Sequence, residues 1–166
     1  RAHPVDIGKG EQFEPEFLRI APSGKIPAIV DEDAGIALME SGAIMLYLAE
    51  LAGVQDDWVG ATMVERAQTY RFLSWHHTNS RLKITLEYLL PVVLMPAYTG
   101  VAPPPAAEVD RLRSRGREAI TLLDALLRQH GRYLGGDRPT VADLFIAADL
   151  FELDADPAQI DTFDTP

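Results

Sequence analysis

Residues 21–29 read Ala21-Pro22-Ser23-Gly24-Lys25-Ile26-Pro27-Ala28-Ile29. Pro22 ends the short helix that we predict from Pro15 to Arg19, because the residue before a proline is pushed toward extended conformations. The Ile26–Pro27 bond is a candidate cis peptide bond, since only X-Pro bonds take that form at a modest cost of about 0.5–1 kcal/mol. The alternative is an ordinary trans proline at the start of a strand.

The residues that follow this segment predict a hairpin and then a helix. Two short apolar runs, 28–30 and 36–38, flank the acidic turn 31–35, which ends in glycine. The sequence Glu40-Ser41-Gly42-Ala43-Ile44 then opens a helix that we predict over residues 42–52. Upstream, we expect a short strand at Val5-Asp6-Ile7.

The second part of the chain reads as helical throughout. Thr62-Met63-Val64-Glu65 is a capping box at the start of a long helix, and Thr140-Val141-Ala142-Asp143 is a second capping signal. Between them, residues 109–127 carry an unbroken apolar face that ends near Gly131. With a boundary at Gly53–Asp57, we predict one domain over residues 1–53 and an all-helical domain over residues 57–166.

Composition excludes several classes of function. The 166 residues carry a net charge of −10, which argues against nucleic acid and against an anionic membrane surface as partners. The chain has no cysteine, so a disulfide scaffold, a thiolate zinc site and a cysteine nucleophile within it are excluded. No apolar run approaches the roughly 18–20 residues of a membrane span. The adjacent His76 and His77 point to different helix faces and therefore do not form a metal-binding pair.

Three stretches together resemble the glutathione transferase family. They are residues 21–29, residues 40–44 and the segment Tyr133-Leu134-Gly135-Gly136-Asp137-Arg138-Pro139-Thr140-Val141-Ala142-Asp143. The segment Phe72-Leu73-Ser74-Trp75-His76-His77-Thr78, followed by Arg81, looks like the theta-type subgroup. The resemblance implies an α+β thioredoxin-like N-terminal domain followed by an all-α helical bundle. It also implies that the family's first strand and helix, and its closing helices, are missing from this chain, so that the first domain is incomplete.

The resemblance implies glutathione as co-substrate and assigns its contacts. Ser41, at a helix start, would hold the γ-glutamyl carboxylate, and Glu40 would pair with the ammonium group. Ile26, before the cis Pro27, would pair through its backbone with the cysteinyl residue. Lys25 and Gln12 look like contacts to the glycyl carboxylate. The competing interpretations are that Ser41 only caps its helix and that Lys25 is simply solvated.

The resemblance also implies a site for the second substrate. Arg81 matches an arginine that theta-type relatives aim at the active-site cleft, although a surface arginine on a long helix is an equal alternative. A hydrophobic electrophile would lie among five side chains of the helical domain, which could equally form a plain bundle core. They are Tyr70, Leu73, His77, Tyr88 and Met95.

The implied reaction is conjugation of the glutathione thiolate to that electrophile, in a cytoplasmic homodimer that serves detoxification. The serine that activates the thiol in theta-type relatives has no counterpart here, so we assign no catalytic residue and no metal to this chain. Dehalogenases and ether-cleaving lyases that use the same co-substrate remain open. The main alternative is a non-catalytic binding or assembly module of the same fold, which often loses the Glu-Ser pair that is intact here.

Overall fold

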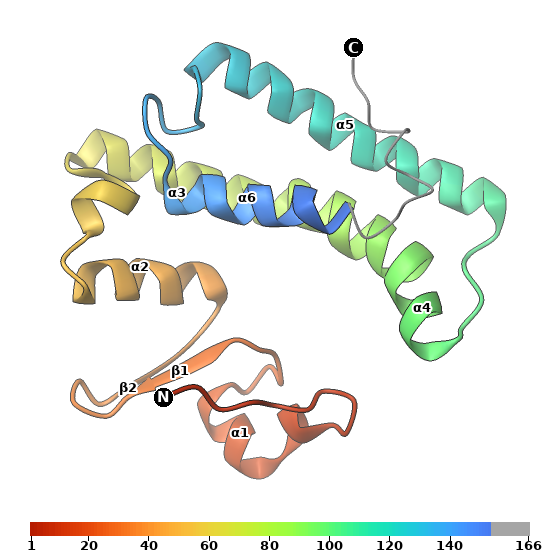
Figure 1. Cartoon of the computed structure of the whole chain (residues 1–166), viewed down its shortest axis with the longest axis horizontal. Helices are drawn as coiled ribbons and strands as arrows, with labels where there is room; N and C mark the ends of the chain where they lie inside the picture. Colours follow the sequence, from red (N-terminus) through yellow and green to blue (C-terminus); the bar gives the residue numbers. More distant parts are fainter. Residues whose placement is uncertain (154–166) are drawn as a thin grey trace. The chain divides into compact units, whose positions relative to one another are not determined.

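The computed structural model describes residues 1–153. The chain forms two compact units, one over Arg1–Gln55 and one that begins at Asp56. The first unit holds a short 3-10 helix, two further helices and a two-stranded antiparallel sheet (Figure 1). Its elements are η1 (Glu11–Phe13), α1 (Pro15–Ile20), β1 (Ala28–Asp31), β2 (Ile36–Met39) and α2 (Ser41–Leu51).

The predicted hairpin and the predicted helices of this unit are present. Strand β1 pairs with β2 so that Ala28 lies opposite Met39 and Asp31 opposite Ile36. Gly35, at φ 66°, closes the turn in the left-handed region that favours glycine. Helix α1 begins at Pro15, and the Ile26–Pro27 bond is cis, as predicted from the sequence.

The strand predicted at Val5-Asp6-Ile7 is wrong. Asp6 instead starts a tight turn: its carbonyl accepts from the N–H groups of Lys9 and Glu11, both at 3.2 Å. The Asp6 N–H donates to the Glu11 side chain at 2.7 Å. A strand needs a partner for its backbone groups, and here these groups are satisfied by local contacts instead.

The second unit is helical. It begins with a short π-helix, η2, and its second π-helix, η3, contains Pro91. Its elements are η2 (Asp56–Gly60), α3 (Met63–Thr78), η3 (Arg81–Leu94), α4 (Met95–Thr99), α5 (Ala106–His130) and α6 (Val141–Glu152). Helix α6 packs against both α3 and η3, and α5 packs against η3 (Figure 1).

Helix η3 supplies the centre of this unit's core. Ile84, Tyr88 and Leu89 are fully buried, and they meet Leu112 and Ala119 of α5. Leu153, the last described residue, closes the same cluster. The apolar face predicted for α5 is therefore the face that packs, and Gly131 follows the end of that helix at His130 as expected.

Side-chain caps fix the starts of α3 and α6. The Glu65 carboxylate accepts from the N–H groups of Ala61 and Thr62, at 2.7 and 3.0 Å, and Thr62 accepts from the Glu65 N–H. These bonds lower the pKa of Glu65, with the Thr62 N–H as the largest cause. At α6, Asp143 accepts from the N–H and hydroxyl of Thr140 at 2.8 and 2.9 Å. Both predicted capping boxes are confirmed.

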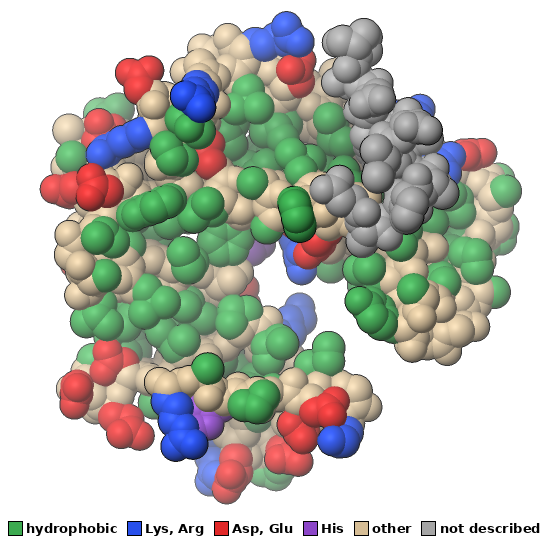
Figure 2. Space-filling view, in the orientation of Figure 1, with side chains coloured by type: hydrophobic (Ala, Val, Ile, Leu, Met, Phe, Trp, Pro, Cys, Tyr) green, Lys and Arg blue, Asp and Glu red, His purple; other side chains and the backbone are tan. Residues whose placement is uncertain are grey.

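Large hydrophobic side chains also reach the surface of both units (Figure 2). Leu48 and Leu51 of α2 are exposed, as are Met63 and Val64 at the start of α3. Within residues 1–153, no helix is both long and apolar enough to cross a membrane.

Candidate functional site

The N-terminus of α2 differs from those of α3 and α6. Glu40 precedes the helix with a positive φ of 72° and makes no side-chain cap. Its carboxylate is exposed, whereas Ser41 at the first helical position is half-buried. The first turn holds no acidic side chain. Because the first N–H groups of a helix lack intrahelical partners and attract negative charge, this end is suited to a carboxylate.

The hairpin register brings the cis proline to the end of the hairpin at which α2 begins. Ala28 at the start of β1 lies opposite Met39 at the end of β2. Ile26 and Pro27 therefore precede β1 at the same end of the hairpin at which Glu40 and Ser41 follow β2. Ile26 is 51% exposed, so part of its surface is open to a ligand. The Ser23 hydroxyl, which lies 3.7 Å from the Met39 sulfur, also joins the two segments.

Gln12 and Lys25 lie close to this end of the hairpin. Gly24, at φ 61°, packs under the ring of Phe13, and a Cβ there would meet that ring at 2.8 Å and the Gln12 carbonyl oxygen at 3.4 Å. The Gln12 amide donates to the Ile7 carbonyl at 3.5 Å, while its Oε1 is buried and has no hydrogen-bond partner within the described residues. Lys25 is exposed. The Gln12 backbone therefore lies beside Gly24, the residue that precedes Lys25.

Arg81 is committed to an ion-pair network in the helical unit. Its Nη1 lies 3.2 Å from Asp149 Oδ1 and 3.3 Å from Glu152 Oε1 of α6. The Thr85 hydroxyl lies within hydrogen-bond distance of the same two carboxylates, at 3.2 and 3.0 Å. The Arg81 side chain is 39% exposed, so it keeps a surface toward solvent. Sequence reasoning did not identify these partners.

Asp149 is the centre of this network. Its side chain is 1% exposed, and its Oδ2 lies 2.9 Å from His76 Nδ1. Burial raises the pKa of Asp149, but the bonds and charge that His76, Ser80 and Arg81 supply outweigh it and hold the pKa below its ordinary value. A signal was present in the sequence, because Asp149 falls on the same helical stripe as the buried Ala142 and Ile146.

The Ser80, His76 and Asp149 side chains do not form a catalytic triad. His76 Nδ1 faces both Ser80 Oγ, at 3.1 Å, and Asp149 Oδ2. A triad needs the acid on one ring nitrogen and the nucleophile on the other. Ser80 is also fully buried, so no substrate reaches its hydroxyl. The cluster therefore ties α3, η3 and α6 together. His77 is exposed whereas His76 is buried, as expected for adjacent positions on different faces of a helix, although their ring centroids lie 5.1 Å apart.

The side chains expected to line an electrophile pocket fall into two groups. Tyr88 is fully buried in the core cluster and Leu73 is 7% exposed, so both belong to the interior of the helical unit. For Tyr88 the expectation is corrected, because a side chain enclosed on all sides offers no surface to a ligand. Tyr70, His77 and Met95 are exposed. Their role in substrate binding stays a prediction.

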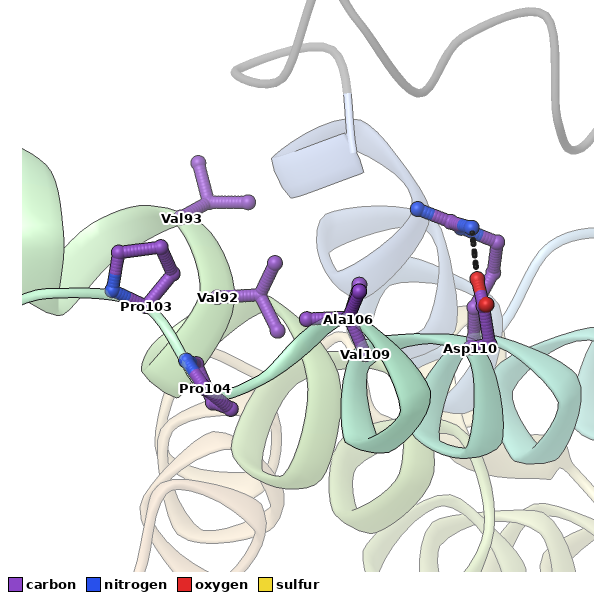
Figure 3. Close-up of a pocket in the computed structure, with 8 residues that line it drawn as sticks. Val92, Val93, Pro103, Pro104, Ala106, Val109 and Asp110 are labelled. Atoms are coloured by element: carbon purple, nitrogen blue, oxygen red, sulfur yellow. Dashed lines mark hydrogen bonds and ion pairs between the residues drawn. The ribbon is translucent and has the colours of Figure 1, made fainter.

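A shallow apolar groove of about 540 Å³ lies elsewhere on the helical unit. Figure 3 shows Val92 and Val93 of η3 across from Ala106 and Val109 of α5, with Pro103 and Pro104 along the connecting loop. An ion pair between Asp110 and Arg113, at 2.8 Å, closes one side. Arg81 and the five predicted pocket residues are not among its lining. Within residues 1–153, no cluster of His, Asp and Glu side chains is arranged to hold a metal ion.

The hairpin with its cis proline, the open start of α2 and the helical second unit define a glutathione-transferase type of architecture. Two family models match the chain: "Glutathione S-transferase, N-terminal domain" over residues 1–50 and "Glutathione S-transferase, C-terminal domain" over residues 106–165. Together they cover more than half of the sequence. The chain belongs to the glutathione S-transferase family.

Individual relatives agree with this assignment. Over 152 residues the chain is 38% identical to glutathione S-transferase T2 of Arabidopsis thaliana. The matched region covers 90% of this chain and 25% of that protein. It is 45% identical to the disulfide-bond oxidoreductase YfcG of Escherichia coli over 84% of this chain and 62% of YfcG. The solved structure of human glutathione transferase theta-2 with glutathione matches with a TM-score of 0.77 and 27% identity, over 97% of this chain and 70% of that one. The chain therefore resembles theta-type members, and it spans less than two thirds of these two curated relatives.

Proposed function

We propose that this chain belongs to a glutathione transferase that joins the glutathione thiolate to a hydrophobic electrophile. The observation that supports it best is the meeting of Ile26–Pro27 with Glu40–Ser41 at one end of the hairpin, beside an uncapped helix N-terminus. The relatives described above are named as enzymes, which favours this function over a non-catalytic assembly module.

The first unit supplies the groups that would hold glutathione. The N–H groups at the start of α2 and the Ser41 hydroxyl bind the γ-glutamyl carboxylate, because that end of the helix is positive and unfilled. The exposed Glu40 carboxylate pairs with the ammonium group. The Ile26 backbone meets the cysteinyl residue, and Lys25 with Gln12 binds the glycyl carboxylate. We place this glutathione-binding domain at residues 1–53 and the helical domain at 57–166.

The chemistry requires a thiolate. A cysteine thiol has a pKa of about 8.5, so little of the nucleophile is present at neutral pH unless the protein stabilises it. The sulfur then attacks an electrophilic carbon, the carbon–sulfur bond forms, and the leaving group departs with its electron pair. In this proposal Arg81, which keeps a solvent-facing surface, stabilises negative charge on the sulfur or the leaving group. We assign no thiol-activating residue and no metal to this chain.

The electrophile is proposed to be hydrophobic and the enzyme to be a cytoplasmic homodimer that acts in detoxification. Tyr70, His77 and Met95 offer exposed amphipathic and apolar surface for the substrate. The exposed Leu48 and Leu51 of α2 are consistent with burial against a second copy. Light scattering during size-exclusion chromatography tests the dimer, and a mass equal to a single chain would contradict it.

A kinetic assay tests the proposed reaction. The protein is mixed with glutathione and an aryl chloride activated by nitro groups, and formation of the thioether is followed by absorbance. We expect Ser41→Ala to raise KM for glutathione by at least about tenfold, while KM for the aryl chloride stays unchanged. Equal changes in both KM values would contradict the assignment of Ser41 to the glutathione side.

A second reaction is favoured by the 45% identity to a disulfide-bond oxidoreductase. In this second reaction, one glutathione thiolate attacks a sulfur of the disulfide RS–SR and releases RS⁻. The product of this step is the mixed disulfide GS–SR. A second glutathione thiolate attacks the mixed disulfide and releases the second RS⁻. The products are oxidised glutathione and two thiols, so the two electrons come from the two glutathione molecules.

The two reactions are separated by their products. A soluble dialkyl disulfide replaces the aryl chloride, and oxidised glutathione is measured by coupling to its NADPH-dependent reduction. Turnover of the disulfide without thioether formation would replace the conjugation proposal by disulfide reduction. Turnover of the aryl chloride alone would support conjugation.

A further inference from the structure

A hydrogen bond between side chains ties helix α2 to strand β1. The Tyr47 hydroxyl donates to Asp31 Oδ2 at 2.6 Å, and the bond is partly buried. The other carboxylate oxygen, Oδ1, accepts from the Ala34 N–H at 3.0 Å and so braces the hairpin turn. Asp31 thus connects the turn, the end of β1 and the middle of α2. Neither residue was assigned a role from the sequence.

The chemistry of the bond makes it a firm connection. A hydroxyl that donates to an ionised carboxylate forms a short, charge-assisted bond, which is stronger than one between neutral groups. The Tyr47 hydroxyl is the largest cause of a lowered pKa at Asp31, and the same bond raises the pKa of Tyr47. At neutral pH the donor is therefore protonated and the acceptor ionised.

The bond joins the two elements that carry opposite ends of the candidate site. Ser41 lies six residues before Tyr47 on α2, a distance of about 9 Å along a helix axis. Ile26 lies just before β1, the strand that ends at Asp31. Between them the chain passes through Glu40, whose positive φ turns it from β2 into α2. The angle between α2 and the hairpin therefore depends on contacts such as the Tyr47–Asp31 bond.

We propose that Tyr47 and Asp31 are positioning residues for glutathione, because their bond holds the start of α2 in place relative to the backbone at Ile26. The inference rests on the proposed function, in which a single ligand touches both places. A ligand that bridges two elements binds more tightly when those elements are already correctly placed, since less ordering is needed on binding. Neither Tyr47 nor Asp31 needs to touch glutathione for this effect.

Calorimetric titration of glutathione into a set of variants tests the inference. Tyr47→Phe removes only the hydroxyl, and Asp31→Ala removes its acceptor. We expect each to raise the Kd for glutathione about three- to tenfold, the range that corresponds to one hydrogen bond. Tyr47→Phe added to Asp31→Ala should cause no further loss, because the bond is already absent. Tyr98→Phe, at a side chain that is 84% exposed on α4, is the matched control and should bind as the original protein does.

The stoichiometry of binding separates positioning from a general loss of structure. If a variant is merely less well folded, the number of sites falls and the Kd of the remaining sites is unchanged. A positioning role raises the Kd at unchanged stoichiometry. Asp31→Asn keeps an oxygen that accepts the hydroxyl, so it should bind more tightly than Asp31→Ala. If Tyr47→Phe does not fold, this pair carries the test, and equal Kd values for the two variants would overturn the inference.

Ser41→Ala distinguishes failure of the inference from failure of the proposed function. An unchanged Kd in Tyr47→Phe, together with a raised Kd in Ser41→Ala, would overturn the positioning role and leave the proposed function standing. Unchanged Kd values in both variants would overturn both. Raised Kd values in Tyr47→Phe and in Ser41→Ala, together with a double variant that binds no more weakly than Asp31→Ala, would support both the positioning role and the proposed function.

Discussion

Replacement of Asp149 by asparagine should strongly destabilise the helical unit. Asp149 is 1% exposed and lies 2.9 Å from His76 and 3.2 Å from Arg81. Hydrogen bonds to a buried charged group contribute about 1.5–3 kcal/mol each. Arg81 keeps Glu152 as a partner and is 39% exposed, so part of its interaction with Asp149 is screened by solvent. We therefore expect Asp149→Asn to lower the free energy of unfolding by about 2–3 kcal/mol.

The effect should depend on pH with a defined sign. Because the folded-state pKa of Asp149 lies below its ordinary value of 3.8, the unfolded chain binds the proton first as the pH falls. The stabilisation is complete above the unfolded-state pKa and is lost as the pH falls through the lower folded-state pKa. Asparagine does not titrate. The difference in stability between the two proteins should therefore shrink as the pH falls below about 4.

Urea denaturation followed by the fluorescence of Trp58 and Trp75 measures this difference. A change of 2–3 kcal/mol corresponds to a midpoint lower by about 1 M urea, for a slope of about 2–3 kcal/mol/M. Asp124→Asn on α5 is the matched control, because Asp124 makes an exposed pair with Arg128 and should contribute less than about 1 kcal/mol. The reasoning would be refuted if Asp149→Asn behaved like this control, or if the gap between the two proteins were as large at pH 3 as at pH 7.

Two further substitutions test local features of the helical unit by the same denaturation assay. Asp143→Ala removes the acceptor for the N–H and hydroxyl of Thr140 and should cost about 1–2 kcal/mol, so an unchanged urea midpoint would show that the cap is dispensable. Gly60→Ala places a Cβ 2.6 Å from that of Glu65, at φ 137°, and should cost about 2 kcal/mol or more. Gly100→Ala, after α4 in the same unit, has φ 72° but open space around the added Cβ, and it should cost only about 1 kcal/mol. Equal losses in Gly60→Ala and Gly100→Ala would contradict the predicted clash.

Local signals in the sequence were sufficient for much of the fold. The capping pairs Thr62 with Glu65 and Thr140 with Asp143 act over one helical turn, and the start of a helix depends on such neighbours. The hairpin was predictable because the acidic turn and its closing glycine lie between two apolar runs. The cis Ile26–Pro27 bond followed from a motif whose meaning came from the family resemblance rather than from proline chemistry alone.

The failure at Val5–Ile7 shows the limit of local reasoning about strands. The β-branched residues Val5 and Ile7 favour an extended chain. A strand nevertheless forms only when its backbone N–H and C=O groups find a partner. Here the N–H and carbonyl of Asp6 and the carbonyl of Ile7 are bonded within a turn. The local sequence does not decide between a strand and a turn at residues 5–7, because the partner of a strand lies elsewhere in the chain.

Predictions for the site were limited by long-range contacts in the same way. The residues expected at the hairpin end could be named because they occur in short motifs. The partners of Arg81 on α6 could not, since Asp149 and Glu152 meet it only after the helices pack. Tyr88 shows the converse error, because an amphipathic aromatic residue has the same sequence signature in a core as in a pocket.

The claim that the start of α2 holds glutathione is tested most directly by calorimetric titration of glutathione into the protein and into Ser41→Ala. We predict binding by the original protein and a Kd at least about tenfold higher for Ser41→Ala, equivalent to about 1.4 kcal/mol, with both samples equally folded. Equal Kd values for the two proteins, or no binding by the original protein, would contradict the claim.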